Sequence, residues 1–150
     1  MPRFLLPVGE LAASLGEAGE VARGLTIVDD TLTRCRARDE AWYVAELLRI
    51  KGELLLKETG GESMSAAEQC FDEALEVAPR QGALFWELRS ALSLARMRLR
   101  QNRQDEALRV LTPAYRKFTE GFEIADLRAA RTLFETLSQS RTELKSRPSR

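Results

Sequence analysis

At 150 residues, with 44% hydrophobic and 31% charged side chains, the chain is long enough to bury one core and differs in composition from disordered chains and membrane proteins. The 23 basic and 23 acidic side chains balance, so the long-range attraction that nucleic acid or an anionic membrane requires is lacking. The sequence contains no histidine, which excludes Ser-His-Asp and Cys-His catalysis and the common histidine-bound metal sites.

Helices are predicted along most of the chain, because Ala, Leu, Glu and Arg are abundant and alternating β-branched runs are absent. Turn residues divide the chain into seven predicted helices, at about 5–15, 21–36, 39–57, from Ser63 or Ser65 to Pro79, 84–100, 104–118 and 124–138. The polar stretch 141–150 is predicted to be disordered. The apolar run at the start of the chain is interrupted by Pro7 and Glu10 and is too short for a signal peptide or a membrane span, so a cytoplasmic location is expected.

Small residues recur at matching places in successive helix pairs. Gly24, Ala67 and Ala107 each open the second helix of a pair. Positions four residues further on hold Val28, Phe71 and Leu111, and positions seven further on hold Thr31, Ala74 and Ala114. In the preceding helices the matching small residues are Ala12, Gly52 and Ala95. The chain is therefore predicted to be one domain over residues 1–140, with helix pairs at about 5–38, 40–81 and 83–121 and a capping helix at about 123–139.

This pattern resembles the tetratricopeptide repeat, in which small residues let paired helices approach closely and a large residue fills the space between units. The middle pair matches best, through Leu48, Gly52, Leu55, Ala67, Phe71, Ala74 and Pro79. The resemblance implies an all-α fold, a right-handed α-solenoid of three antiparallel helix pairs with a C-terminal capping helix. The units repeat about every 40 residues, more than the roughly 34 of that family, so a HEAT-like helical repeat remains an alternative.

A narrower resemblance covers much of the chain from Trp42 onward. Segments such as WYVAELLRIKGELLL and FTEGFEIADL are similar to the C-terminal helical region of large bacterial signalling proteins, which join a cyclase or a DNA-binding domain to a P-loop ATPase. The sequence has no P-loop motif, so the ATPase itself is absent from this stretch. The resemblance implies a part in bacterial signalling or transcription regulation.

The residues that could carry chemistry each have a plainer explanation. Acidic pairs such as Glu46 with Glu53 are typical of solvated helix surfaces. Cys35 and Cys70 are expected to be reduced and buried, with a disulfide or a reactive thiol as the alternatives. Core packing is expected for most aromatic side chains, with a ligand pocket as the alternative; these are Trp42, Tyr43, Phe71, Phe85, Trp86, Phe118, Phe122 and Phe134.

The predicted site lies on the first helices of the second and third pairs, which line the concave face in the tetratricopeptide architecture. Arg89, Arg96 and Arg100 share one helical stripe, which could bind an acidic peptide, a peptide terminus or a phosphate. Counting the inward positions gives the full predicted partner-binding set: Glu46, Arg49, Glu53, Arg89, Ser93, Arg96 and Arg100. The alternative is that the glutamates neutralise the arginines within the chain.

The predicted function is therefore a non-catalytic protein-interaction or regulatory module. It binds a peptide or a partner domain and needs no cofactor or metal, nucleic acid or membrane. Two alternatives remain. One is a homodimer formed through the N-terminal helix pair around Phe4, Leu5, Leu6 and Leu11, and the other is a small-molecule sensor domain or an enzyme with a pocket between repeats.

Overall fold

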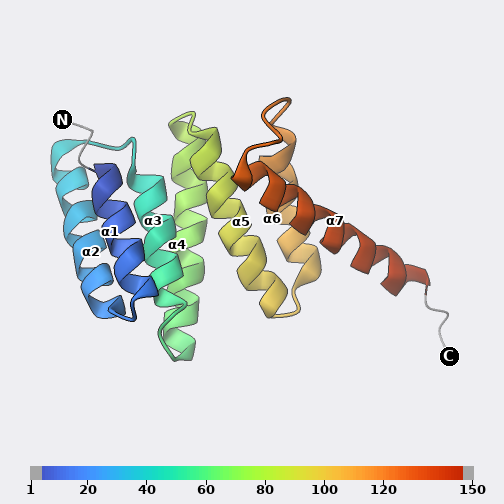
Figure 1. Ribbon diagram of the computed structural model, residues 1–150, viewed down its shortest axis with the longest axis horizontal. Coiled ribbons are helices and arrows are strands. Elements are labelled where there is room, and N and C mark those ends of the chain that lie inside the picture. Colours follow the sequence, from blue (N-terminus) through green and yellow to red (C-terminus); the bar gives the residue numbers. More distant parts are fainter. Residues whose placement is uncertain (1–4, 147–150) are drawn as a thin grey trace. The chain divides into compact units, whose positions relative to one another are not determined.

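The computed structural model describes the backbone of residues 5–146 and the side chains of residues 7–143. Within this range the chain is all-helical, as predicted, with seven α-helices and no strand (Figure 1). The helices are α1 (Leu5–Glu17), α2 (Val21–Arg38), α3 (Val44–Leu55), α4 (Gly61–Arg80), α5 (Leu84–Arg100), α6 (Gln104–Arg116) and α7 (Ala125–Ser146). None of these described helices is both long enough and apolar enough to cross a membrane.

The chain divides into two units, residues 1–90 and 91–150. The boundary lies inside α5, so it is not a linker between helices. The first unit contains α1 to α4 and the beginning of α5, and the second contains the rest of α5 with α6 and α7. The single domain predicted for residues 1–140 stays a prediction.

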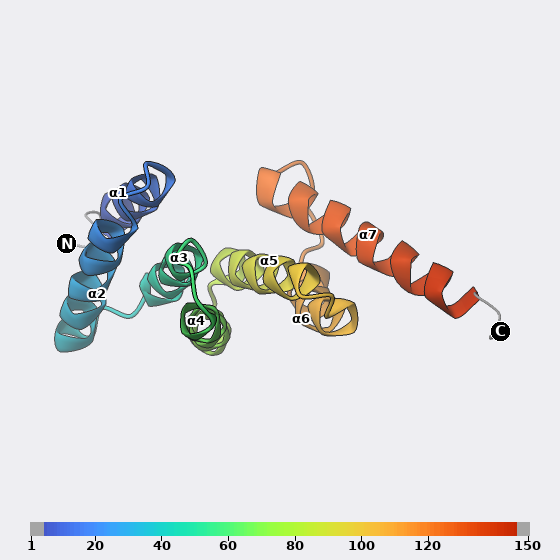
Figure 2. The ribbon, with the colours of Figure 1, turned by 90° about the horizontal axis from the view of Figure 1, so that it is seen from below.

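In the first unit each helix packs against the next one in the chain. α1 contacts α2, α2 contacts α3, α3 contacts α4, and α1 also contacts α3 (Figure 2). Short turns between α1 and α4 reverse the chain at Gly19, Asp39 and Gly60, each of which has a positive φ angle. Helices that are adjacent in sequence therefore lie side by side.

Small residues stand where the helices of the first unit approach most closely. A Cβ atom added to Gly24 on α2 would lie 2.8 Å from the carbonyl oxygen of Ala12 on α1. A Cβ atom added to Gly52 on α3 would lie 2.5 Å from the ring of Phe71, which is fully buried on α4. Burial of a ring of this size stabilises the fold by about 2–3 kcal/mol. The prediction that small residues mark close contacts, with Phe71 between neighbouring helices, is confirmed at these positions.

The predicted start of the third helix is wrong by five residues. Residues from Asp39 were expected to be helical, but α3 begins at Val44. Asp39 adopts a left-handed conformation, with φ 54°, and ends α2, while the backbone N–H of Glu40 donates to the carbonyl oxygen of Cys35. Aspartate tolerates this conformation better than most residues and so can replace the usual glycine.

Helix ends near prolines also differ from the prediction. Pro79 was expected to close the fourth helix, but it lies within the last turn, and α4 continues to Arg80. α7 continues to Ser146, so residues 141–146 are helical where a disordered tail was predicted. No glycine or proline lies between Gly121 and Pro148, so nothing in the local sequence stops the helix earlier. Residues 147–150 lie outside the described range.

Both cysteines are free and buried, as predicted. Burial raises the pKa of the Cys35 thiol, with a smaller contribution from Glu40, and burial likewise raises the pKa of Cys70. A raised pKa leaves less of the nucleophilic thiolate, so the reactive-thiol alternative loses support.

The aromatic side chains of the first unit mostly pack in its core. Tyr43 is 1% exposed, and its ring centroid lies 5.2 Å from that of Trp42 and 5.6 Å from that of Trp86. Phe85 departs from the prediction, because it is 41% exposed.

In the second unit α6 packs against α7. The ring of Tyr115 on α6 stacks on that of Phe134 on α7, with centroids 5.9 Å apart, and meets Phe122 edge to face at 6.1 Å. Apolar residues of both helices are buried: Ala107, Leu111, Ala114, Leu127, Ala130 and Leu137. This contact places one polar face of α6 beside one face of α7.

Candidate functional site

Four of the seven residues predicted to bind a partner join in one ion cluster in the first unit. Glu46 on α3 is 2% exposed. Arg49 donates to both of its carboxylate oxygens, from Nε to Oε2 at 2.9 Å and from Nη2 to Oε1 at 2.8 Å. Arg89 on α5 donates from Nη1 to the same Oε1 at 2.5 Å. Glu53 completes the cluster, with its Oε1 atom 3.8 Å from Nη1 of Arg49.

A carboxylate buried this deeply needs partners, because an unpaired charge in the interior is strongly unfavourable. The two arginines supply them, and the cluster holds two positive and two negative groups. The Arg89 guanidinium also lies 5.8 Å from the centre of the Trp86 ring, within the range of a cation–π contact. For Arg49 and Arg89 the structure therefore agrees with the alternative, in which glutamates of the same chain neutralise the arginines.

The other three predicted residues lie further along α5, and they do not behave alike. Ser93 is 4% exposed and so offers little surface to a partner, and its assignment to the binding surface stays a prediction. Its sequence neighbours Leu92 and Leu94 are buried as well. Arg96 and Arg100 are exposed, and neither forms an ion pair with any residue that the structure describes. Of the three arginines in the predicted stripe, Arg96 and Arg100 are therefore the two that are exposed and outside the ion cluster.

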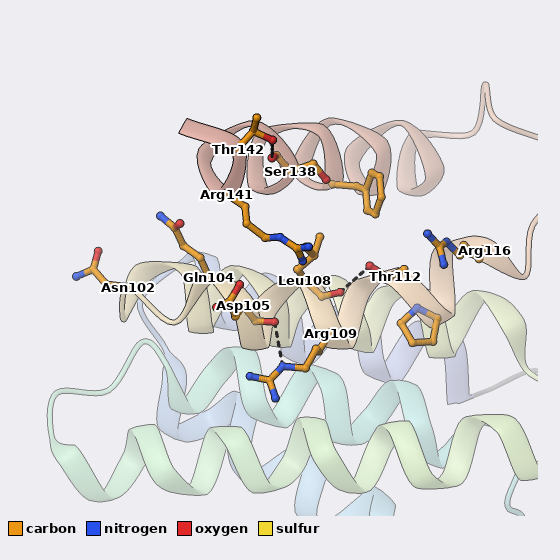
Figure 3. A pocket seen from close by; sticks show the side chains of 12 residues that line it. Asn102, Gln104, Asp105, Leu108, Arg109, Thr112, Arg116, Ser138, Arg141 and Thr142 are labelled. Atoms are coloured by element: carbon orange, nitrogen blue, oxygen red, sulfur yellow. Dashed lines mark hydrogen bonds between the residues drawn. The ribbon is translucent and has the colours of Figure 1, made fainter. Parts of the chain in front are cut away.

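The second unit contains a groove between α6 and α7 that sequence reasoning missed. It is open to solvent and has a volume of about 1110 Å³. Its lining comes from the turn before α6, from one face of α6 and from one face of α7: Asn102, Gln104, Asp105, Leu108, Arg109, Thr112, Pro113, Arg116, Phe134, Ser138, Arg141 and Thr142 (Figure 3).

The regular spacing of the α6 lining was visible in the sequence. Asp105, Arg109, Thr112 and Arg116 follow one another at intervals of four, three and four residues, which places them on one helix face. The sequence did not show that α7 lies beside this face. It also placed the end of the seventh helix at Ser138, before the two lining residues at positions 141 and 142.

Positive charge dominates the groove. The lining contains three arginines, Arg109, Arg116 and Arg141, and one carboxylate, that of Asp105. The Nε atom of Arg109 donates to the backbone carbonyl oxygen of Asp105 at 3.3 Å. Arg116 and Arg141 form no ion pair with a residue in the described part of the chain. Figure 3 shows Arg141 reaching from α7 toward Leu108, while Arg116 lies toward the other end of α6 and Arg109 points away from α7.

Two of the three hydroxyl groups in the groove lining donate to backbone oxygens of their own helices. Thr112 Oγ1 donates to the carbonyl oxygen of Leu108 at 2.7 Å, and Thr142 Oγ1 to that of Ser138 at 3.0 Å. With their protons engaged in this way, these hydroxyls are not paired with a base that would activate them as nucleophiles. No three acidic or cysteine side chains among the described residues are grouped as a metal site would require.

Glu106, the acid next to the groove in sequence, is bound elsewhere. Arg103 donates to its two carboxylate oxygens, from Nε at 3.0 Å and from Nη2 at 2.5 Å. This hydrogen bonding lowers the pKa of the Glu106 carboxyl, and the nearby charges of Arg98 and Arg109 act in the same direction. Because its carboxylate is engaged with Arg103, Glu106 does not offset the charge of the groove arginines by direct pairing.

Comparison with protein-family models, with curated proteins and with solved structures finds no match to this chain.

Proposed function

We propose that the chain is a non-catalytic protein-interaction module and that the groove between α6 and α7 holds a segment of its partner. The observation that carries this proposal is the groove itself, which is open to solvent and whose lining contains three arginines and one aspartate. Its apolar lining residues, Leu108, Pro113 and Phe134, offer contacts for a partner's side chains. Mixed apolar and polar linings of this kind are typical of surfaces that hold peptides.

The same groove favours binding over catalysis. General acid–base chemistry on the pattern of paired carboxylates needs two such groups, and the lining contains only Asp105. A small-molecule sensor buries most of its ligand in a concave cavity. A groove that is open to solvent suits a chain segment better than a compact metabolite.

The family context is part of the proposal. We propose that the helix pairs form a tetratricopeptide-like solenoid, right-handed and capped by α7, in the cytoplasm of a bacterium. The buried small residues at the helix contacts, Gly24 and Gly52 among them, support this assignment. The partner is then a component of a signalling or transcription-regulating system.

The test compares two tryptophan substitutions on α7. Ser138 lines the groove, whereas its neighbour Gln139 is exposed and does not line it. Ser138→Trp fills the groove, and Gln139→Trp adds the same bulk elsewhere on the helix. Proteins captured from a bacterial lysate are purified, and their binding to each variant is measured by calorimetry, with helicity checked by circular dichroism.

We expect Ser138→Trp to weaken binding of the purified partner by about tenfold or more, equivalent to about 1.4 kcal/mol. Gln139→Trp is expected to bind as the native protein does. Equal binding by the native protein and Ser138→Trp would show that the partner lies elsewhere, and Arg96 and Arg100 on α5 would then be the next surface to change.

A further inference from the structure

We infer that the segment held between α6 and α7 is acidic and extended, with carboxylates that pair with Arg116 on α6 and Arg141 on α7. This inference rests on the proposed function and adds the chemistry of the ligand. It begins with a contrast inside the molecule. In the first unit Arg49 and Arg89 have a buried carboxylate between them, that of Glu46.

The groove arginines have no equivalent acid. Three guanidinium groups and one carboxylate give the lining a net charge of +2 (three minus one), in a chain whose total charge is zero. The positive charge is therefore local to this groove and is not a property of the whole surface. Arg116 and Arg141 keep their five N–H donors free of any ion pair with described residues, and each fork matches the two oxygens of a carboxylate.

The arrangement of the arginines sets the spacing of the acids. Arg141 reaches from α7 toward Leu108 (Figure 3), and eight residues of α6 separate Leu108 from Arg116, a rise of roughly 12 Å. An extended peptide advances about 3.3 Å per residue, so acidic residues about three to four positions apart cover a similar distance. An apolar residue between the two acids would meet Leu108 and Pro113.

A nucleic acid fits these observations less well. Proteins that bind single strands combine a basic track with aromatic faces on which bases stack. The aromatic residue of this lining is Phe134, and its ring already stacks on Tyr115. Three arginines beside an aspartate also give a short positive patch in a neutral chain, too little for tight phosphate-backbone binding.

The experiment uses the full chain and fluorescently labelled peptides, with binding read by fluorescence anisotropy at low salt. The first probe is a peptide with two glutamates three positions apart and a leucine between them. The second has glutamines in place of the glutamates. A labelled RNA oligonucleotide is the third probe, and inorganic phosphate serves as a competitor for the first.

Two double variants distinguish an effect of the groove arginines from a general effect of positive charge on the surface. Arg116→Gln with Arg141→Gln removes two groove cations. Arg128→Gln with Arg131→Gln removes the same charge from exposed positions that do not line the groove. We expect the acidic peptide to bind, the glutamine peptide to bind at least about tenfold more weakly, and the groove variant to lose about tenfold in affinity. The control variant is expected to stay within about twofold.

Four results would overturn the inference. They are equal binding of the glutamine peptide, an equal loss in the control variant, tighter binding of the RNA, and complete displacement by millimolar phosphate, which would indicate a phosphate site. Failure of the inference is distinguishable from failure of the proposed function. If Ser138→Trp blocks the captured partner while the groove arginine variant does not, the groove binds a partner that is not acidic. If neither change affects the partner, both proposals fail.

Discussion

Glu46→Gln is the sharpest stability test that the structure offers. The substitution keeps the size of the side chain and removes the charge that holds Arg49 and Arg89. The Glu46 side chain is 3% exposed, that of Arg49 14% and that of Arg89 34%. Removing one member of a buried ion pair costs about 3–5 kcal/mol. Arg89 reaches water, and a glutamine oxygen can still accept one hydrogen bond, so we expect the free energy of unfolding to fall by about 2–3 kcal/mol.

Urea unfolding followed by circular dichroism measures this loss. Glu53→Gln is the matched control, because Glu53 is on the same helix, 39% exposed and 3.8 Å from Arg49. That change should cost about 0.5 kcal/mol or less. Adding Arg89→Met to Glu46→Gln removes one of the two cations that bind the Glu46 carboxylate and should recover part of the stability. Equal losses of unfolding free energy in Glu46→Gln and Glu53→Gln would contradict this prediction. So would a double variant whose loss equals the sum of the losses in Glu46→Gln and Arg89→Met alone.

Three other measurements test the packing and the assembly of the chain. Gly52→Ala forces a Cβ atom to within 2.5 Å of the Phe71 ring and should lower the unfolding temperature, whereas Gly61→Ala, with open space around it, should not. Burial, with a smaller contribution from Glu46, raises the pKa of Tyr43 from 10 to about 12. Stability should therefore be complete below pH 10 and fall by about 2–3 kcal/mol as the pH rises to 12, and an ultraviolet titration in which Tyr43 ionises near pH 10 would contradict this. The dimer predicted through the N-terminal helix pair requires that light scattering give twice the chain mass and that Leu11→Glu, at a 52% exposed position, restore the monomer; a native monomer at high concentration counts against it.

Much of the helical layout could be read from the sequence because it depends on local chemistry. Glycine pairs, polar turns and the spacing of small residues act over a few positions, and they placed the start of α2, α5 and α6 correctly. Helix ends that depend on an unusual backbone conformation of one residue were not predicted. The left-handed Asp39 delays α3, and nothing in a propensity scale distinguishes it from a helical aspartate.

The candidate site was harder to predict from the sequence, because it depends on which helix faces meet in the folded chain. The spacing of Glu46 and Arg49 made an intrahelical pair visible, but the arrival of Arg89 from α5 is a tertiary contact. The helical stripe therefore identified Arg89 as a candidate, but it did not show that Glu46 binds its guanidinium. The groove needed the packing of α6 against α7, and helical periodicity alone does not say which neighbour a polar face will have. The phenolic ring of Tyr115 against Phe134 makes that contact.

Site-specific photo-crosslinking can locate the partner on the chain and so test whether it lies between α6 and α7. A photoreactive residue is placed at Ser138 in the groove, at Gln139 beside it and at Arg96 on the exposed part of α5. We predict that the captured partner crosslinks at position 138 and not at position 139 or 96. Crosslinking at position 96 with none at 138 would show that the partner binds at α5 and not in the groove between α6 and α7.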